Sequence, residues 1–318
     1  MPRSKSSPNA SVATAHDEPM LATRLISAGI LAPIVVAVSL LGEPWVSSLV
    51  GLLVFLAMVE LISLLDAGGF APPQVVALAV GIVVAGAGLV AANQALVGGS
   101  LADLLRATDP PGLPTVVFAG AVVLLGVVGF TRAEPRDGFL TWAVTSFGIA
   151  YVALLAPFIV VVAHLAPAGG TAATPIGALN LHAGTAWMLL LLLVVWGYDS
   201  GAYLTGRWLG RRRLIDHISP SKTVEGLVGG LLAGTVAAGI GSWLVGLEAW
   251  QPLVIGPMIG LAAQAGDLAE SLIKRAAGRK ESGFLVPGHG GVLDRIDSFL
   301  FAAPVLVFYA LLTSGYSL

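Results

Sequence analysis

Charged side chains and glycines are concentrated near the end of the chain, between Ser271 and Asp297. This segment reads SLIKRAAGRKESGFLVPGHGGVLDRID and mixes basic residues, acidic residues and a histidine among its glycines. Only 11% of the chain is charged, so such a concentration needs a reason. Cations and carboxylates beside glycines, which leave backbone N–H groups accessible, are what phosphates and a divalent metal require. The segment therefore predicts a site for phosphates and a metal.

Acidic residues on both sides of this loop have helical spacing. One stripe, with spacings i, i+3, i+4 and i+7, is formed by Asp267, Glu270, Ser271 and Lys274. Carboxylates from two helix ends form a hard-oxygen site of the kind that Mg²⁺ takes while substrate phosphates supply further ligands. The predicted metal ligands are Asp267, Glu270, Asp294 and Asp297. The alternative is a network of salt bridges that closes the rim of the protein, but it leaves the glycines and His289 unexplained.

An earlier polar patch surrounds Asp199, which interrupts an apolar helix near its end. An ionised carboxylate at such a depth is costly and usually functional. Tyr203 lies one turn further on and could donate a hydrogen bond to it. Alternatively, Asp199 pairs with Arg207 or with the run Arg211–Arg213, although that run also suits anionic lipid head groups.

A further patch is the segment SPSKTVEG, which precedes another apolar run. Ser219 suits an N-cap and Pro220 suits the first helical position, so we predict that a helix begins here. Free N–H groups at a helix start attract phosphate, and Lys222 with Ser221 and Thr223 would complete such a site. An ordinary capped helix with a lysine that reaches to the interface explains the same residues, and the sequence leaves both interpretations open.

The composition predicts where these patches lie. Of the 318 residues, 56% are hydrophobic, and the mean hydropathy is +0.90, whereas soluble domains carry about 25% charged residues. We therefore expect an all-α, polytopic integral membrane protein. A net charge of −2 indicates no nucleic-acid partner, and the absence of cysteine excludes disulfides and thiolate metal sites. A spanning helix needs roughly 20 apolar residues, and nine segments qualify, at about 24–42, 45–65, 74–92, 114–130, 139–164, 184–205, 224–246, 252–271 and 298–315.

The basic residues indicate an orientation. With a cytoplasmic N-terminus, 15 of the 16 Lys and Arg residues fall on the inner side, and only Arg106 falls outside. All of the polar patches then face the cytoplasm. Glu60 and Asp66, near the inner end of the second span, are interpreted as structural or interfacial groups. The predicted organisation is a disordered tail over 1–23, N-terminal transmembrane helices over 24–180, and a C-terminal catalytic transmembrane region over 181–318.

Together, these patches resemble the signature of the phosphatidate cytidylyltransferase (CDP-diacylglycerol synthase) family. That signature reads S-x-x-K-R, then K-D after four residues, then P-x-H-G-G-x-x-D-R-x-D. The matching positions are Ser271, Lys274, Arg275, Lys280, Glu281, Pro287, His289, Gly290, Gly291, Asp294, Arg295 and Asp297. The patches Asp199–Tyr203 and Ser219–Gly226 are similar to the family as well. The N-terminal half resembles it only as membrane helices.

The resemblance implies that CTP and phosphatidate react to give CDP-diacylglycerol and pyrophosphate, with Mg²⁺ as cofactor and a second cation left open. The catalytic residues would be Asp267, Lys274, Arg275, His289, Asp294 and Arg295. The substrate-binding residues would be Asp199, Tyr203, Ser219, Ser221, Lys222, Thr223, Glu225, Ser271, Lys280, Gly290 and Gly291. The expected setting is the bacterial inner (plasma) membrane, among membrane lipids and with the site facing the cytoplasm; a homodimer is suggested by the resemblance alone.

Two positions depart from the family pattern: Glu281 stands where the family usually has Asp, and Phe284 where it usually has His. Glu keeps the charge on a longer arm. The motifs carry no information about the acyl chains of the substrate, so a cytidylyltransferase acting on another lipid phosphate is one alternative. A catalytically silent lipid-binding relative is a second. A membrane transporter of an anionic solute is a third, but its polar groups would be expected near the bilayer midplane, often with repeat symmetry.

Overall fold

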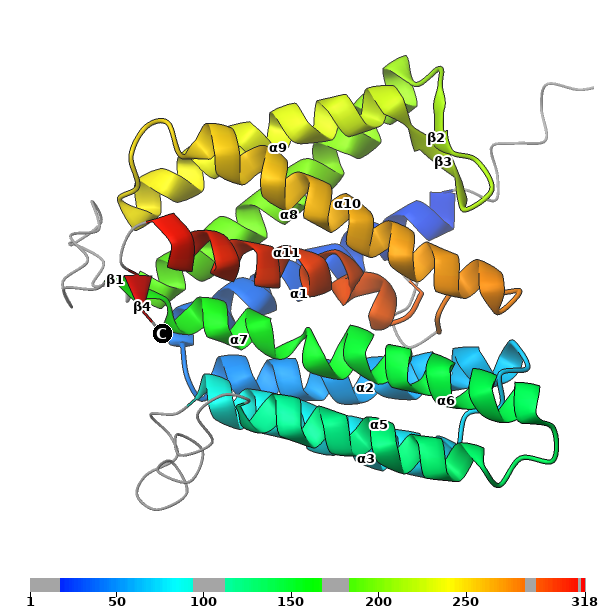
Figure 1. Cartoon of the computed structure of the whole chain (residues 1–318). Helices are drawn as coiled ribbons and strands as arrows, with labels where there is room; N and C mark the ends of the chain where they lie inside the picture. Colours follow the sequence, from blue (N-terminus) through cyan, green and yellow to red (C-terminus); the bar gives the residue numbers. More distant parts are fainter. Residues whose placement is uncertain (1–17, 94–111, 168–182, 284–289, 314–315, 318) are drawn as a thin grey trace, which may run out of the picture.

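The structure is a computed structural model that describes residues 18–93, 112–167, 183–283, 290–313 and 316–317. Helices dominate it (Figure 1). They are α1 (Glu18–Leu41), α2 (Trp45–Ala67), α3 (Gln74–Ala92), α5 (Leu113–Gly129), α6 (Pro135–Ile149), the π-helical turn η1 (Ala150–Leu154), α7 (Pro157–His164), α8 (Ala183–Leu209), α9 (Val224–Val245), α10 (Pro252–Ala276) and α11 (Leu293–Thr313). Two short antiparallel ladders pair β1 (Ala166–Pro167) with β4 (Tyr316–Ser317) and β2 (Arg213–Ile215) with β3 (Ser219–Thr223).

The predicted class, an all-α polytopic membrane protein, is confirmed. Each segment predicted to span the membrane is helical over most of its length. Within the described residues, seven helices are long and apolar enough to cross a membrane, with Pro135–His164 counted as one span. Gly29–Leu41 and α5 are shorter apolar helices. The count of nine spans and the cytoplasmic N-terminus stay predictions.

The predicted disordered tail was too long. Helix α1 begins at Glu18, so 18–23 is already helical; residues 1–17 lie outside the described part of the chain. Pro19 suits the first turn of a helix, where its missing N–H costs nothing. Met20, Leu21 and Ala22 are good helix formers that continue into the apolar run.

Helices α8, α9, α10 and α11 pack together, and α11 also contacts α2 and α7 of the N-terminal half. Small residues let α8 and α9 approach closely, as is common between membrane helices. A Cβ atom on Gly201 of α8 would lie only 2.4 Å from the Cβ of Ala233 in α9. Fully buried side chains such as Trp187 and Leu191 fill the interior beside them. The C-terminal helices therefore form a close-packed frame.

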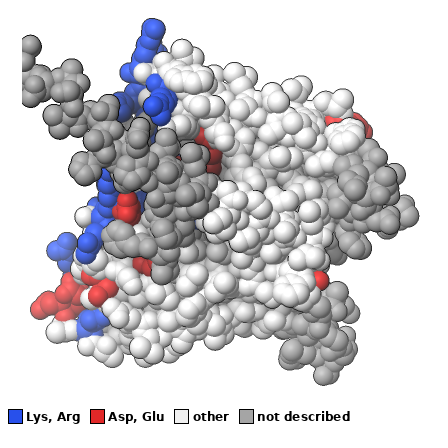
Figure 2. Space-filling model, turned by 180° about the vertical axis from the view of Figure 1, so that it is seen from behind, with Lys and Arg blue, Asp and Glu red and all other residues white. Residues whose placement is uncertain are grey.

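Charged side chains gather at one end of these helices, as Figure 2 shows, while the flank seen in that view carries mostly uncharged residues. Helices α8 and α10 end there, α11 begins there, and the β2–β3 hairpin lies beside them (Figure 1). The start of α1 lies at the same end. This clustering is the one that the sequence predicts for the inner side.

Helix α9 starts later than predicted. Ser219 was expected as the N-cap, but 219–223 forms strand β3, and Thr223 is the N-cap. Its Oγ1 accepts a hydrogen bond from the N–H of Gly226 at 3.1 Å. Pairing of β3 with β2 explains the later start, because it gives the backbone of residues 219–223 partners in an extended conformation.

Candidate active site

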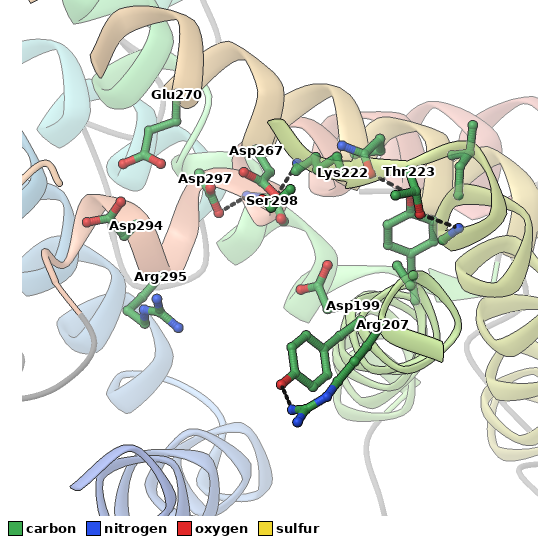
Figure 3. Close-up of a pocket in the computed structure, with 18 of the residues that line it drawn as sticks. Asp199, Arg207, Lys222, Thr223, Asp267, Glu270, Asp294, Arg295, Asp297 and Ser298 are labelled. Carbon is green, nitrogen blue, oxygen red and sulfur yellow. Dashed lines mark hydrogen bonds and ion pairs between the residues drawn. The ribbon is translucent and has the colours of Figure 1, made fainter. Parts of the chain in front are cut away.

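A cavity of about 550 Å³ lies among α8, α9, α10 and α11 (Figure 3). This volume is within the usual range of small-molecule sites, about 300–1,000 Å³. Many of the predicted site residues line it: Asp199, Tyr203, Ser221, Lys222, Thr223, Asp267, Glu270, Lys274, Asp294, Arg295 and Asp297. The polar patches that are separate in the sequence therefore meet around one space.

The centre of the cavity is acidic. Asp267 and Glu270 come from α10 and Asp297 comes from α11, and one carboxylate oxygen from each lies within 4.8 Å of the others. Glu270 and Asp297 are buried. A Cβ atom on Gly266 would lie 2.3 Å from the backbone oxygen of Asp297, so a glycine is needed for α10 and α11 to come this close. Figure 3 shows Asp199 at another side of the cavity, on α8.

Two lysines contact these carboxylates. The Nζ of Lys222, from the end of β3, donates to Oδ2 of Asp267. The Nζ of Lys274 lies 2.6 Å from Oε2 of Glu270 and also donates to Oδ1 of Asp294. Carboxylates at this depth are costly unless they are paired. The lysines provide that pairing.

Asp294 lies outside the group of three carboxylates. It holds Ser282 and Gly291, which precede α11, by hydrogen bonds. Its Oδ2 accepts hydrogen bonds from the Oγ of Ser282 at 2.7 Å and from the N–H of Gly291 at 2.8 Å. Gly290 has φ +78°, and a Cβ there would lie 2.8 Å from the same oxygen. The motifs also predict Asp294 as a metal ligand, and that assignment stays a prediction.

The central carboxylates fit a hard divalent cation. Three carboxylate oxygens within reach of one another are a typical partial ligand set for Mg²⁺. Glu270 adds a second observation: its Oε1 is buried without a hydrogen-bond partner among the described residues, while its Oε2 binds Lys274. A buried unpaired carboxylate oxygen is unfavourable, and a metal or its bound water would satisfy it.

Other predicted site residues lie outside the cavity lining: Arg275, Ser219, Glu225, Ser271, Lys280, Gly290 and Gly291. Two of them make hydrogen bonds to the backbone of the segment that connects α8 with α9. The Nε of Arg275 donates to the backbone oxygen of Ile218 at 3.1 Å. Oε2 of Glu225 accepts from the backbone N–H groups of Arg211 and Arg212 at 3.0 and 3.2 Å. His289 lies outside the described residues.

Ser271 contacts a carboxylate of the acidic centre but does not line the cavity. Its Oγ lies 3.5 Å from Oδ1 of Asp267, one turn earlier in α10, to which it donates a hydrogen bond. This contact follows from the i, i+4 spacing that the sequence shows. Ser271 therefore supports a carboxylate of the cavity, and its predicted contact with substrate stays a prediction.

The structure differs from the expected pairing around Asp199. The spacing allowed Tyr203 to donate to Asp199, whereas in the structure its hydroxyl accepts a hydrogen bond from Nη1 of Arg207 at 2.9 Å. Arg207 itself lines the cavity, although the sequence suggested it only as a partner of Asp199. A polar contact between the buried Tyr198 hydroxyl and Oε1 of Gln264, at 2.8 Å, was not predicted. The signal that could have indicated these contacts is the occurrence of polar residues within otherwise apolar helices.

The sequence profile of the Cytidylyltransferase family matches residues 22–313. The chain belongs to the cytidylyltransferase family. This confirms the family that the motifs indicated, and it extends the match into the N-terminal half.

Among similar curated proteins, this cytidylyltransferase-family chain is 43% identical over 135 residues to a phosphatidate cytidylyltransferase of Synechocystis sp., covering 42% of the chain and 46% of that protein. It is 45% identical over 125 residues to a phosphatidate cytidylyltransferase of Staphylococcus saprophyticus, covering 39% and 48%. It is 33% identical over 218 residues to uncharacterized protein YnbB of Escherichia coli K12, covering 68% and 67%. The chain thus spans about half the length of the two named cytidylyltransferases that it matches.

Proposed function

We propose that this protein transfers the cytidylyl group of CTP to phosphatidate, giving CDP-diacylglycerol and pyrophosphate. One observation carries the proposal: in a chain of this family, three carboxylates and two lysines from separate segments meet in one cavity. The relatives named phosphatidate cytidylyltransferase support the choice of lipid. Every described residue that lines the cavity lies at or after Tyr198, which supports the assignment of 181–318 as the catalytic region.

The reaction needs positioning more than acid–base chemistry. A phosphate oxygen of phosphatidate attacks the α-phosphorus of CTP, and the bond from that phosphorus to the bridging oxygen of the β-phosphate breaks, which releases pyrophosphate. The nucleophile is already anionic at pH 7, so a strong general base is not required. The protein must hold two anions together and stabilise charge on the leaving group.

The side chains of the cavity can meet these demands. Asp267, Glu270 and Asp297 would hold Mg²⁺, which when bound offsets the charge of the triphosphate. Lys222 and Lys274 would exchange part of their pairing with carboxylates for contacts with phosphate oxygens. Arg295, which also lines the cavity, would add positive charge for the lipid phosphate or the pyrophosphate.

We propose that the cavity faces the cytoplasm of a bacterial inner membrane, with CTP arriving from water and phosphatidate from the bilayer. The gathering of Lys and Arg at one end of the helices supports this orientation (Figure 2). The excess of Lys and Arg expected on the cytoplasmic side also supports a cytoplasmic N-terminus. A homodimer is suggested by the family resemblance, and cross-linking in membranes would test it.

The test is a two-substrate assay. Purified protein in mixed micelles with Mg²⁺, phosphatidate and CTP labelled at the α-phosphate should form a lipid-soluble labelled product together with an equal amount of pyrophosphate. Diacylglycerol in place of phosphatidate is the control, because it lacks the nucleophilic phosphate. Label that stays water-soluble with phosphatidate present would contradict the proposal. Product formed from another lipid phosphate alone would favour the alternative substrate.

Glu281→Asp is expected to keep or raise the rate of product formation. Glu281 is exposed beside the site and occupies the position where the family usually has Asp. If the position follows the family, the shorter carboxylate keeps the charge and fits at least as well. Initial rates at saturating CTP measure the effect, with Glu134→Gln, another exposed carboxylate outside the cavity, as the control. A large loss in Glu281→Asp would show that the neighbouring loop has adapted to the longer side chain.

A further inference from the structure

A buried carboxylate of the N-terminal half contacts the catalytic region. Glu60 lies in α2 and is only 5% exposed. Its Oε1 accepts a hydrogen bond from the N–H of Val292 at 3.0 Å, and its Oε2 accepts one from the N–H of Leu293 at 2.8 Å. These N–H groups stand at the start of α11, where a helix has no internal partners for them. A negative charge there is also favoured by the helix dipole.

Two glycines of the described chain before α11 lie against this carboxylate. A Cβ atom on Gly283 would lie 2.5 Å from Oε1 of Glu60, and a Cβ on Gly291 would lie 2.5 Å from Oε2. A side chain at either position would force the Glu60 carboxylate out of its present place. The two glycines therefore let the backbone at 283 and at 291 approach Glu60 closely.

The anchored backbone leads directly to the cavity. Val292 and Leu293 immediately precede Asp294, whose Oδ2 accepts from the N–H of Gly291 and whose Oδ1 pairs with Lys274. Asp297, one turn further along α11, belongs to the group of three carboxylates. Glu60 itself is not among the residues lining the cavity. Its direct link to the site is therefore the start of α11, which its carboxylate holds.

We propose that Glu60 is a positioning residue for cytidylyl transfer, and that α2 anchors the start of α11 so that Asp294 and Asp297 keep their places in the site. The proposal rests on the proposed function and gives the N-terminal half a role in it. Groups that orient the ligands of a metal site typically contribute about 10–100-fold to activity or metal affinity. An effect of that size is expected here.

The test compares Glu60→Gln with Glu60→Asp. Gln keeps the size of the side chain but turns one acceptor into an N–H₂ donor that faces a backbone N–H. We expect Glu60→Gln to lower kcat by about 10–100-fold with little change in KM for CTP. Asp keeps both acceptor oxygens, and we expect it to recover part of kcat. Asp66→Asn is the matched control, since Asp66 is an exposed carboxylate on the same helix.

A second measurement separates positioning from folding. Hydrogen exchange of the backbone N–H groups of Val292 and Leu293 should become faster in Glu60→Gln, while the melting temperature of the purified protein stays close to that of the wild type. Unchanged kcat in Glu60→Gln would overturn the proposal, and so would an activity loss that only follows loss of folded protein. If the wild type forms no lipid-soluble product, the proposed function fails, whereas the exchange measurement still reports whether Glu60 anchors α11.

Discussion

Asp267→Asn is expected to lower the rate of CDP-diacylglycerol formation by at least about 10–100-fold, the loss typical of groups that merely support metal ligands, while the protein still inserts and folds. The amide has nearly the shape of the carboxylate but removes one of three negative charges that lie within 4.8 Å of one another. It also deprives Lys222 of its ion-pair partner. Initial rates of lipid-soluble label measure the loss. A titration with Mg²⁺ should show a higher half-saturating concentration, because the ligand set is weaker.

Asp137→Asn is a suitable control, since Asp137 is an exposed carboxylate in the first turn of α6, outside the cavity. Asp294→Asn is the informative comparison. If Asp294 binds the metal, the half-saturating Mg²⁺ concentration of the Asp294→Asn variant should rise as it does for Asp267→Asn. If Asp294 mainly holds Lys274 and the loop, activity falls with less change in the Mg²⁺ requirement. Undiminished product in Asp267→Asn would refute the metal assignment.

Local patterns in the sequence predicted much of this architecture. Apolar runs of membrane-spanning length gave the helices, because the bilayer imposes both length and composition. The i, i+3 spacing placed Asp267 and Glu270 on one face of α10, and the structure shows them on the same cavity. Their approach to Asp297 was predicted as well, because Mg²⁺ would take carboxylates from both helix ends, and the structure brings the three together.

Features that depend on distant contacts were not predictable from local patterns. The sequence predicted Ser219 as the N-cap, but residues 219–223 pair with β2 as a strand, so the cap falls to Thr223. Glu60 and Val292 are 232 positions apart, so no periodicity connects them. The sequence shows that Glu60 is a carboxylate near the end of an apolar run, but it does not show which backbone groups Glu60 contacts. The contact of Tyr203 with Arg207 is local, but both Arg207 and Asp199 lie about one turn from Tyr203 on α8, so spacing alone does not choose between them.

Lys274→Met is expected to reduce both activity and stability strongly. Lys274 is 9% exposed, and its ammonium group is shared by Glu270 and Asp294. Met preserves much of the volume but leaves Glu270, which is 0% exposed, without its cation. Breaking a buried ion pair by removing one partner typically costs about 3–5 kcal/mol. We expect a clearly lower melting temperature and a rate at least about 100-fold lower, because a cation for the phosphates is lost as well.

A second substitution separates these two effects. Glu270→Gln in the Lys274→Met background neutralises the carboxylate that lost its partner, so we expect the melting temperature to recover in part. Activity should not recover, because neither the cation nor the carboxylate returns. Arg279→Met, which removes an exposed cation just beyond α10, is the control and should be close to wild type in stability. Recovery of activity together with stability in the double variant would show that Lys274 only balances charge, and that the phosphates of CTP are held by other groups.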